Sequence, residues 1–195
     1  MQLKRTLLPT SSPISLADAK RHLGVTDDLH DRDILALVQA AANTLRRWTG
    51  RELLATTYEL TFRRFPAGVS EGFELPFPPL VSITSIQYYD AAGVLQTYSG
   101  AQIELSEVVP AILWPARNTS WPDVQSDRTD AVKITYVAGY ASPEVLPAEV
   151  GQFIRLLIRH WYDNPSAVTT GSTKEVELSL RLIANSLGTG FYADV

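Results

Sequence analysis

The sequence contains no cysteine among its 195 residues. Disulfide bonds and thiolate metal sites are therefore excluded, so the fold does not depend on an oxidising compartment. Stability has to come from side-chain packing, with or without help from neighbouring subunits. A chain of this length can bury a sizeable core, and one cooperative structural unit is the default expectation.

The sequence also lacks a long apolar run. The basic pair Lys4 and Arg5 is followed by only three residues before Pro9, which is far too short for the apolar centre of a signal peptide. No stretch approaches the roughly 20 apolar residues that cross a bilayer. We therefore expect a soluble protein that is not exported, and a reducing cytoplasm is a compatible place of synthesis.

Positive charge is scarce. The chain has 17 Lys and Arg against 21 Asp and Glu, with a formal net charge of -4 at pH 7 and a pI near 5.4. Proteins that wrap DNA bind it through clustered Lys and Arg that neutralise phosphates. If this protein meets DNA, we expect the DNA to pass by without being gripped. The composition, 45% hydrophobic and 19% charged, is otherwise typical of a globular domain.

Apolar residues recur at helical spacing in four segments. The clearest segment ends at Gly50, a C-cap residue, and it has acidic residues at its start and arginines at its end, as the helix dipole favours. A shorter helix follows Ser15, which has the character of an N-cap. Another helix begins after Pro147 and ends at Asn164. Residues 166–173 are small and polar, and we expect a flexible loop there.

The last expected helix, at about residues 175–187, is apolar on several sides. A helix of this kind needs cover on several sides, because one neighbour can bury only one stripe. We therefore interpret this helix as a candidate contact with another subunit or with a partner protein. Its apolar residues are Val176, Leu178, Leu180, Leu182, Ile183 and Leu187.

Between the helical segments the period changes from helical to alternating, which is typical of strands. Strands are expected near residues 57–63, 73–75, 81–89, 94–98, 102–105, 111–114 and 131–138, separated by turns rich in Pro and Gly. The predicted fold is α+β: a helical bundle from both chain ends with a small inserted antiparallel β unit. The expected parts are residues 1–54 (helical), 55–141 (β-rich) and 142–195 (helices that complete the helical part), forming a single structural unit.

No group of residues has the spacing of a catalytic or metal site. The chain has no Gly-x-Ser-x-Gly pattern, and its three histidines, His22, His30 and His160, lie apart in the sequence. The acidic run at residues 27–33 lacks the glycine and the terminal Glu of a calcium loop, and we favour acidic residues solvated at a helix start, which explain the run without a ligand. We expect no enzyme activity, no catalytic, cofactor-binding or metal-binding residues, and no cofactor; a hydrolase with an assembled site is the weaker alternative.

Two tryptophans, each followed by proline, remain as candidate contact residues. Trp114 and Trp121 bracket a short loop that contains Arg117 as its single basic residue. One interpretation of the pair is a stacking surface for a base or a sugar, but packing of the loop against the β unit is the interpretation that we favour. A third possibility is that both tryptophans face another subunit.

The order and spacing of several short motifs resemble one family of proteins. No single motif is specific, but together they run almost from end to end of the chain. The motifs are residues 13–25 (PISLADAKRHLGV), 48–51 (WTGR), 75–80 (LPFPPL), 121–122 (WP), 134–140 (ITYVAGY) and 160–164 (HWYDN). In this arrangement the chain resembles the head-tail connector (adaptor) proteins of long-tailed phages and of phage-derived gene transfer agents.

The resemblance implies a structural role and not an enzymatic one. It implies a ring, commonly a dodecamer, that docks beneath the portal protein, joins it to a tail-completion or stopper protein, and lets double-stranded DNA pass without specific binding. It also implies a place in the neck of a virion or gene-transfer particle, with assembly in the host cytoplasm and no contact with a membrane. Trp114, Trp121 and the apolar residues of the last helix are then candidate portal or inter-subunit contacts.

A nucleic-acid-binding module is the alternative function, with the first two helices as a helix-turn-helix. The acidic residues at the start of the second helix oppose it, because that end of a recognition helix would face phosphates.

Overall fold

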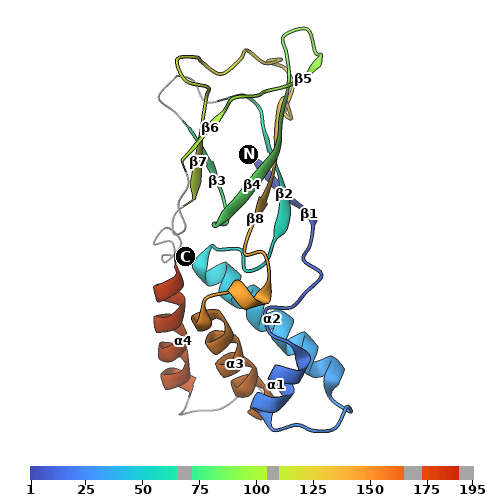
Figure 1. Cartoon of the computed structure of the whole chain (residues 1–195), viewed down its shortest axis with the longest axis vertical. Coiled ribbons are helices and arrows are strands. Elements are labelled where there is room, and N and C mark those ends of the chain that lie inside the picture. The colour runs from blue at the N-terminus through green and yellow to red at the C-terminus, as the bar shows by residue number, and fades with distance from the viewer. Residues whose placement is uncertain (66–71, 105–109, 165–172, 189–195) are drawn as a thin grey trace. The chain divides into compact units, whose positions relative to one another are not determined.

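The chain folds into two compact units in the computed structural model, which describes residues 1–65, 72–104, 110–164 and 173–188. Residues Met1–Pro9 and Ala55–Gly139 form the first, which we call the β unit. Thr10–Leu54 and Tyr140–Val195 form the second, the helical unit. Figure 1 shows the elements of each. The loop expected at residues 166–173 lies, except for its last residue, outside the described residues.

The helical unit is built from segments on both sides of the β-rich part of the sequence. Its elements are α1 (Leu16–Leu23), α2 (Asp31–Thr49), the 3-10 turn η1 (Pro143–Val145), α3 (Ala148–Asp163) and α4 (Thr173–Leu187). The Ser15 side chain accepts a hydrogen bond from the Asp18 amide at 3.0 Å and so caps α1. Gly50 ends α2 in the left-handed conformation, with φ of 64°, which favours glycine.

The core of the helical unit lies between α2 and α3, with α1 and α4 packed against them. In Figure 1, α3 lies between α1 and α4 and contacts both. Apolar residues at helical spacing on α2 and α3 point into this core, as the sequence periodicity predicts. The fully buried members from these two helices are Ile34, Val38, Ala41 and Leu45 on α2 and Phe153, Ile154 and Ile158 on α3.

The β unit contains two antiparallel sheets. The five-stranded sheet has the order β1-β2-β8-β4-β5, and the three-stranded sheet has the order β3-β7-β6. The strands of the larger sheet are β1 (Gln2–Leu7), β2 (Thr56–Phe62), β4 (Leu80–Tyr89), β5 (Leu95–Thr97) and β8 (Val132–Ala138). Those of the smaller sheet are β3 (Phe73–Leu75), β6 (Gln102–Glu104) and β7 (Ala111–Trp114).

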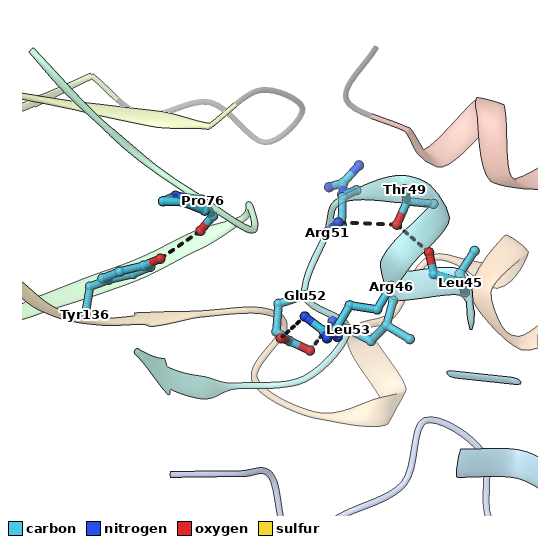
Figure 2. Close-up of polar contacts among 8 residues, drawn as sticks. All are labelled: Leu45, Arg46, Thr49, Arg51, Glu52, Leu53, Pro76 and Tyr136. Atoms are coloured by element: carbon cyan, nitrogen blue, oxygen red, sulfur yellow. Dashed lines mark hydrogen bonds and ion pairs between the residues drawn. The ribbon is translucent and has the colours of Figure 1, made fainter. Parts of the chain in front are cut away.

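Aromatic side chains fill the core between the two sheets. Along β2 and β8 buried and half-buried residues alternate, as expected of a sheet with one face on a core. Tyr58 of β2 stacks on Tyr136 of β8 with ring centroids 5.5 Å apart. The Tyr136 hydroxyl donates a hydrogen bond of 3.0 Å to the Pro76 carbonyl (Figure 2). This bond satisfies a polar group at the end of a fully buried side chain.

The prediction of a helical bundle with a small inserted β unit is wrong in its proportions. The described residues form four α-helices and eight strands in two antiparallel sheets, an α+β fold in which the β unit has a core of its own. Two physical causes explain the error. Strand β1 has only one half-buried residue, Leu3, so it lacks the alternation that signals a strand. The short strands β3, β6 and β7 gain their stability by pairing into a second layer, which local patterns do not reveal.

Replacing Tyr136 by Phe tests the core hydrogen bond of the β unit. We expect Tyr136→Phe to lower the free energy of unfolding by about 0.5–1.5 kcal/mol, because the Pro76 carbonyl loses its donor. Urea denaturation followed by tryptophan fluorescence measures the change. Tyr88→Phe is the matched control, since Tyr88 packs against the same core and no hydrogen bond of its hydroxyl is seen in the described part of the chain. An equal loss in both variants would contradict the role of the hydroxyl.

Candidate assembly surfaces

Helix α4 separates its apolar residues into a buried stripe and an exposed stripe. Leu180, Ala184 and Leu187 are 4%, 4% and 7% exposed and belong to the core of the helical unit. Leu178 and Leu182 are 60% and 63% exposed. These two leucines are four residues apart and so lie next to each other on one helix face.

The other two candidate residues on this helix have different positions. Ile183 is half-buried and packs against the core of the helical unit. The side chain of Val176 lies outside the described residues. The apolar residues of α4 therefore form two groups. Leu180 and Leu187 are buried in the core of the helical unit. The group with Leu178 and Leu182 is exposed.

The end of α4 is held by a buried arginine. Arg51 is 8% exposed, and its guanidinium donates a hydrogen bond of 3.0 Å to the carbonyl of Leu187, the last residue of α4. The same guanidinium donates a bond of 2.9 Å to the Tyr140 hydroxyl. Carbonyls at a helix C-terminus lack intrahelical donors and carry partial negative charge. The Arg51 guanidinium supplies a hydrogen-bond donor to one of these carbonyls, and its positive charge offsets the partial negative charge.

The turn after α2 sets the position of Arg51. The Thr49 hydroxyl donates to the Leu45 carbonyl at 2.9 Å and accepts from the Arg51 amide at 3.3 Å (Figure 2). Gly50, between them, reverses the chain. The WTGR motif therefore has a physical function: it ends α2 and directs its arginine to the end of α4. The sequence indicates only that the arginines here complement the dipole of α2. The fold reveals that Arg51 bonds a carbonyl 136 residues away.

A second charged contact lies beside this turn. Glu52 is 5% exposed, and its carboxylate lies 4.0 Å from the Arg46 guanidinium (Figure 2). The Glu52 carboxylate also accepts a bond of 3.2 Å from the Leu53 amide. A buried carboxylate needs such partners, because an unpaired charge inside a protein is costly. The segment after α2, residues 50–54, is thus fixed by polar contacts within the helical unit.

The two candidate tryptophans have different environments. Trp121 is 7% exposed and stacks on Phe65 with ring centroids 4.8 Å apart and an interplanar angle of 3°. It also contacts Phe73 edge to face and the tilted ring of Tyr98. This placement leaves Trp121 little surface for a partner. Trp114 ends β7 and is half-buried, so part of its surface remains accessible.

The acidic run before α2 forms ion pairs within the helical unit. The Lys20 ammonium lies 2.6 Å from the Asp28 carboxylate and 2.7 Å from that of Asp31. The hydrogen bond from Lys20 holds the pKa of Asp28 below its ordinary value, and the same bond raises the pKa of Lys20. Within the described ranges, no three His, Asp or Glu side chains are arranged to hold a metal ion. The acidic residues therefore join α1 to the start of α2.

The start of α2 also bears on the helix-turn-helix alternative. The side chains of Asp28 and Asp33 are 89% and 80% exposed, so this end of the helix presents negative charge to solvent. Phosphate groups of DNA would be repelled there. The histidines lie on three different elements: His22 on α1, His30 before α2 and His160 on α3. No helix in the described part of the chain is long and apolar enough to span a bilayer.

Solved structures with the same fold come from gene transfer agent (GTA) particles, two of them described as necks. One is described as the neck of an empty GTA particle computed with C6 symmetry, with a TM-score of 0.76, 20% identity, and coverage of 94% of this chain and 95% of that chain. Another, from the virion of a native GTA particle, gives 0.77, 21%, 96% and 95%. A third, from the neck of a native particle computed with C12 symmetry, gives 0.73, 20%, 94% and 94%. At these identities the likeness shows the fold.

The family follows from the sequence itself. A model of the phage gp6-like head-tail connector protein family matches residues 13–110, half of the chain. The chain belongs to this family, as the motif resemblance predicts. A comparison with curated proteins finds no match.

Removing the Arg51 guanidinium tests the anchor of α4. We expect Arg51→Ala to lower the free energy of unfolding by roughly 2–3 kcal/mol, because a charge-assisted bond to the end of α4 is lost. Amide hydrogen exchange at residues 178–187 should accelerate more than exchange in α2. Arg51→Lys should recover only part of the loss, since an ammonium lacks the planar fork that reaches two acceptors.

Arg47→Ala is the control for this experiment, because Arg47 lies on the exposed side of the same helix end. A surface substitution of this kind changes stability by about 0.5 kcal/mol or less. If exchange in α4 were unchanged in Arg51→Ala, the anchor would be ruled out.

Proposed function

We propose that copies of this chain form a closed ring, a dodecamer, that joins the portal to the tail. In this proposal the partners are the portal protein on one side and a tail-completion or stopper protein on the other. Family membership supports the connector role. The symmetries of the neck structures with the same fold, C6 and C12, support a dodecamer. The ring belongs to the neck of the particle and assembles in the host cytoplasm.

The proposed role is structural, without a reaction centre. The polar contacts described above hold elements together: Arg51 bonds the end of α4, and Lys20 joins α1 to α2. A ring of this kind works by burial of complementary surfaces between copies and partners. Specificity then comes from the shape and the charge of those surfaces.

Double-stranded DNA passes through the centre of the proposed ring without specific binding. The net charge of -4 per copy opposes the retention of phosphates, because affinity for duplex DNA depends on clustered basic residues. An acidic ring can line a channel and leave the DNA free to move. Weak affinity for duplex DNA distinguishes the proposed connector from a protein that wraps DNA.

The exposed stripe of α4 is the proposed docking surface for the portal or an adjacent subunit. Leu178 and Leu182 expose apolar area on a helix whose opposite stripe is fixed in the core. Exposed leucines that lie side by side mark contact sites more strongly than single ones. The anchor at Arg51 keeps the end of this helix in place. The half-buried Trp114 is a secondary candidate on the β unit.

Charge introduced into this stripe should block assembly and leave the fold intact. We expect Leu178→Glu and Leu182→Glu to reduce incorporation into particles or portal complexes by at least about tenfold, since roughly 1.4 kcal/mol of lost contact corresponds to that factor. Co-sedimentation with purified portal measures binding, and circular dichroism checks the fold.

Asn43→Glu provides the control, because Asn43 is an exposed residue of α2 in the same unit and the added charge is equal. Asn185 is unsuitable, since it follows Leu178 and Leu182 on the same face of α4. Normal incorporation of both leucine variants would contradict the docking surface. Point substitutions are sharper than deletion of residues 174–195, because the deletion would also remove Leu180, Ala184 and Leu187 from the core.

Native mass measurement tests the ring itself. We expect a mass of twelve copies in the presence of purified portal, in line with the C12 neck of the structural neighbour. A duplex DNA column should not retain the protein at low salt, in contrast to a helix-turn-helix protein, whose retention falls with added salt. A ring that never forms with portal would refute the connector proposal, and salt-dependent retention would favour the nucleic-acid-binding alternative.

A further inference from the structure

The larger sheet of the β unit has two exposed edges that carry apolar side chains. Strand β1 forms one edge; all its residues except Leu3 are exposed. Leu7 and the following Leu8 are 67% and 57% exposed. On the other side of the sheet, Val81 of β4 is 53% exposed. Exposed edges with apolar residues are sites at which another strand can pair, and proteins normally protect or use them.

The outer edge of β4 is open over its first half. Strand β5 pairs with β4 only at Gln87, Tyr88 and Tyr89, and the Ile86 carbonyl accepts a bond from the Tyr98 amide. Among the described strands, none pairs with this edge over residues 80–85. This free stretch is six residues long, and β1 has six residues as well. The two open edges therefore match in length.

The strand directions fit a head-to-tail contact between copies. Every neighbouring pair in the order β1-β2-β8-β4 is antiparallel, so β1 runs opposite to β4. Cyclic symmetry rotates a copy without inverting it, and a sheet continued into the next copy keeps its strand directions. Strand β1 of one copy would therefore lie antiparallel to β4 of the next. This alignment places Leu7 and Leu8 next to Leu80 and Val81.

Irregularities in both strands restrict the pairing to a matching partner. The register of β1 shifts between Arg5 and Leu7, and that of β4 shifts between Leu80 and Ser82 and between Ile83 and Ser85. Bulges of this kind disturb the ladder of free amides and carbonyls, so regular strands pair with them poorly. An edge that is apolar yet irregular is suited to one specific neighbour.

We propose that in the ring, strand β1 of one copy pairs antiparallel with residues 80–85 of β4 in the next copy. The larger sheet then continues from copy to copy, with Leu7 opposite Leu80 and Leu8 at the same end of the contact as Val81. This inference rests on the proposed ring and specifies one of its lateral interfaces. The interface is heterologous, since the two edges differ, as closed rings larger than a dimer require.

Engineered cysteines test this contact directly, because the chain has no cysteine of its own. With six residues paired against six, Arg5 lies opposite Ser82, and both are exposed. The variant Arg5→Cys with Ser82→Cys, assembled on portal and oxidised, should give a ladder of covalent oligomers on a denaturing gel. Arg5→Cys with Thr84→Cys covers a register shift of two residues. Arg5→Cys with Glu74→Cys is the control, because Glu74 lies on β3 of the other sheet.

Charge substitution provides a readout that needs no covalent bond. Leu7→Asp should lower the yield of rings by roughly tenfold or more, the effect of about 1.4 kcal/mol of lost contact. Ile103→Asp, at a 43% exposed residue of β6, should leave the yield unchanged. Rings of normal mass without a ladder in either test pair, and with full yield for Leu7→Asp, would overturn the edge pairing and leave the ring proposal intact. Absence of rings in the unmodified protein would overturn both.

Discussion

The helical unit depends on one buried guanidinium that joins three segments distant in sequence. Arg51 follows α2, Tyr140 precedes η1 and α3, and Leu187 ends α4. Bringing these segments together costs chain entropy, which a single surface contact would not offset. Two charge-assisted bonds from a buried guanidinium stabilise the arrangement more than a surface contact does, because each bond supplies a donor to an acceptor inside the unit. The exposed leucines of α4 gain a fixed position from this anchor.

The two proposed contact surfaces lie in different compact units. The exposed stripe of α4 belongs to the helical unit, and the open edges of β1 and β4 belong to the β unit. Each unit has its own core, so a substitution on one surface leaves the packing of the other core untouched. Docking to a partner and association between copies can therefore be separated by point variants. Such a separation is harder in a protein with a single core, where interface changes spread through shared packing.

The sequence predicts elements well where periodicity is strong. The apolar residues of α2 and α3 recur at helical spacing and are buried as predicted. Strand β7, at residues 111–114, also appears where alternation and flanking prolines place it. In contrast, β1 offers no apolar alternation, because one face of this edge strand packs through Leu3 alone. Its remaining residues are exposed, so the strand is recognised only when its pairing with β2 is known.

The candidate contact residues show the same limit. On α4 the sequence reveals an excess of apolar residues, but tertiary packing decides that Leu180 and Leu187 turn inward and that Leu178 and Leu182 remain exposed. Trp121, which the sequence also offered as a contact residue, is a core residue stacked on Phe65, in agreement with the packing interpretation favoured from the sequence. The partner of Arg51 could not be predicted, because nothing local links residue 51 to a carbonyl at Leu187.

A short edge contact between copies is adequate only if another contact brings the copies together first. A six-residue strand pairing with bulges offers few bonds, and free copies at low concentration would associate weakly through it. Once docked on a common partner, neighbouring copies face each other at an effective concentration in the millimolar range, and a weak lateral contact becomes sufficient. In the proposed assembly, weak edges would keep rings from closing away from the portal, where they would compete with ordered assembly. The proposal therefore assigns docking on the partner to the apolar stripe of α4, and the weaker lateral contact between copies to the bulged edges of β1 and β4.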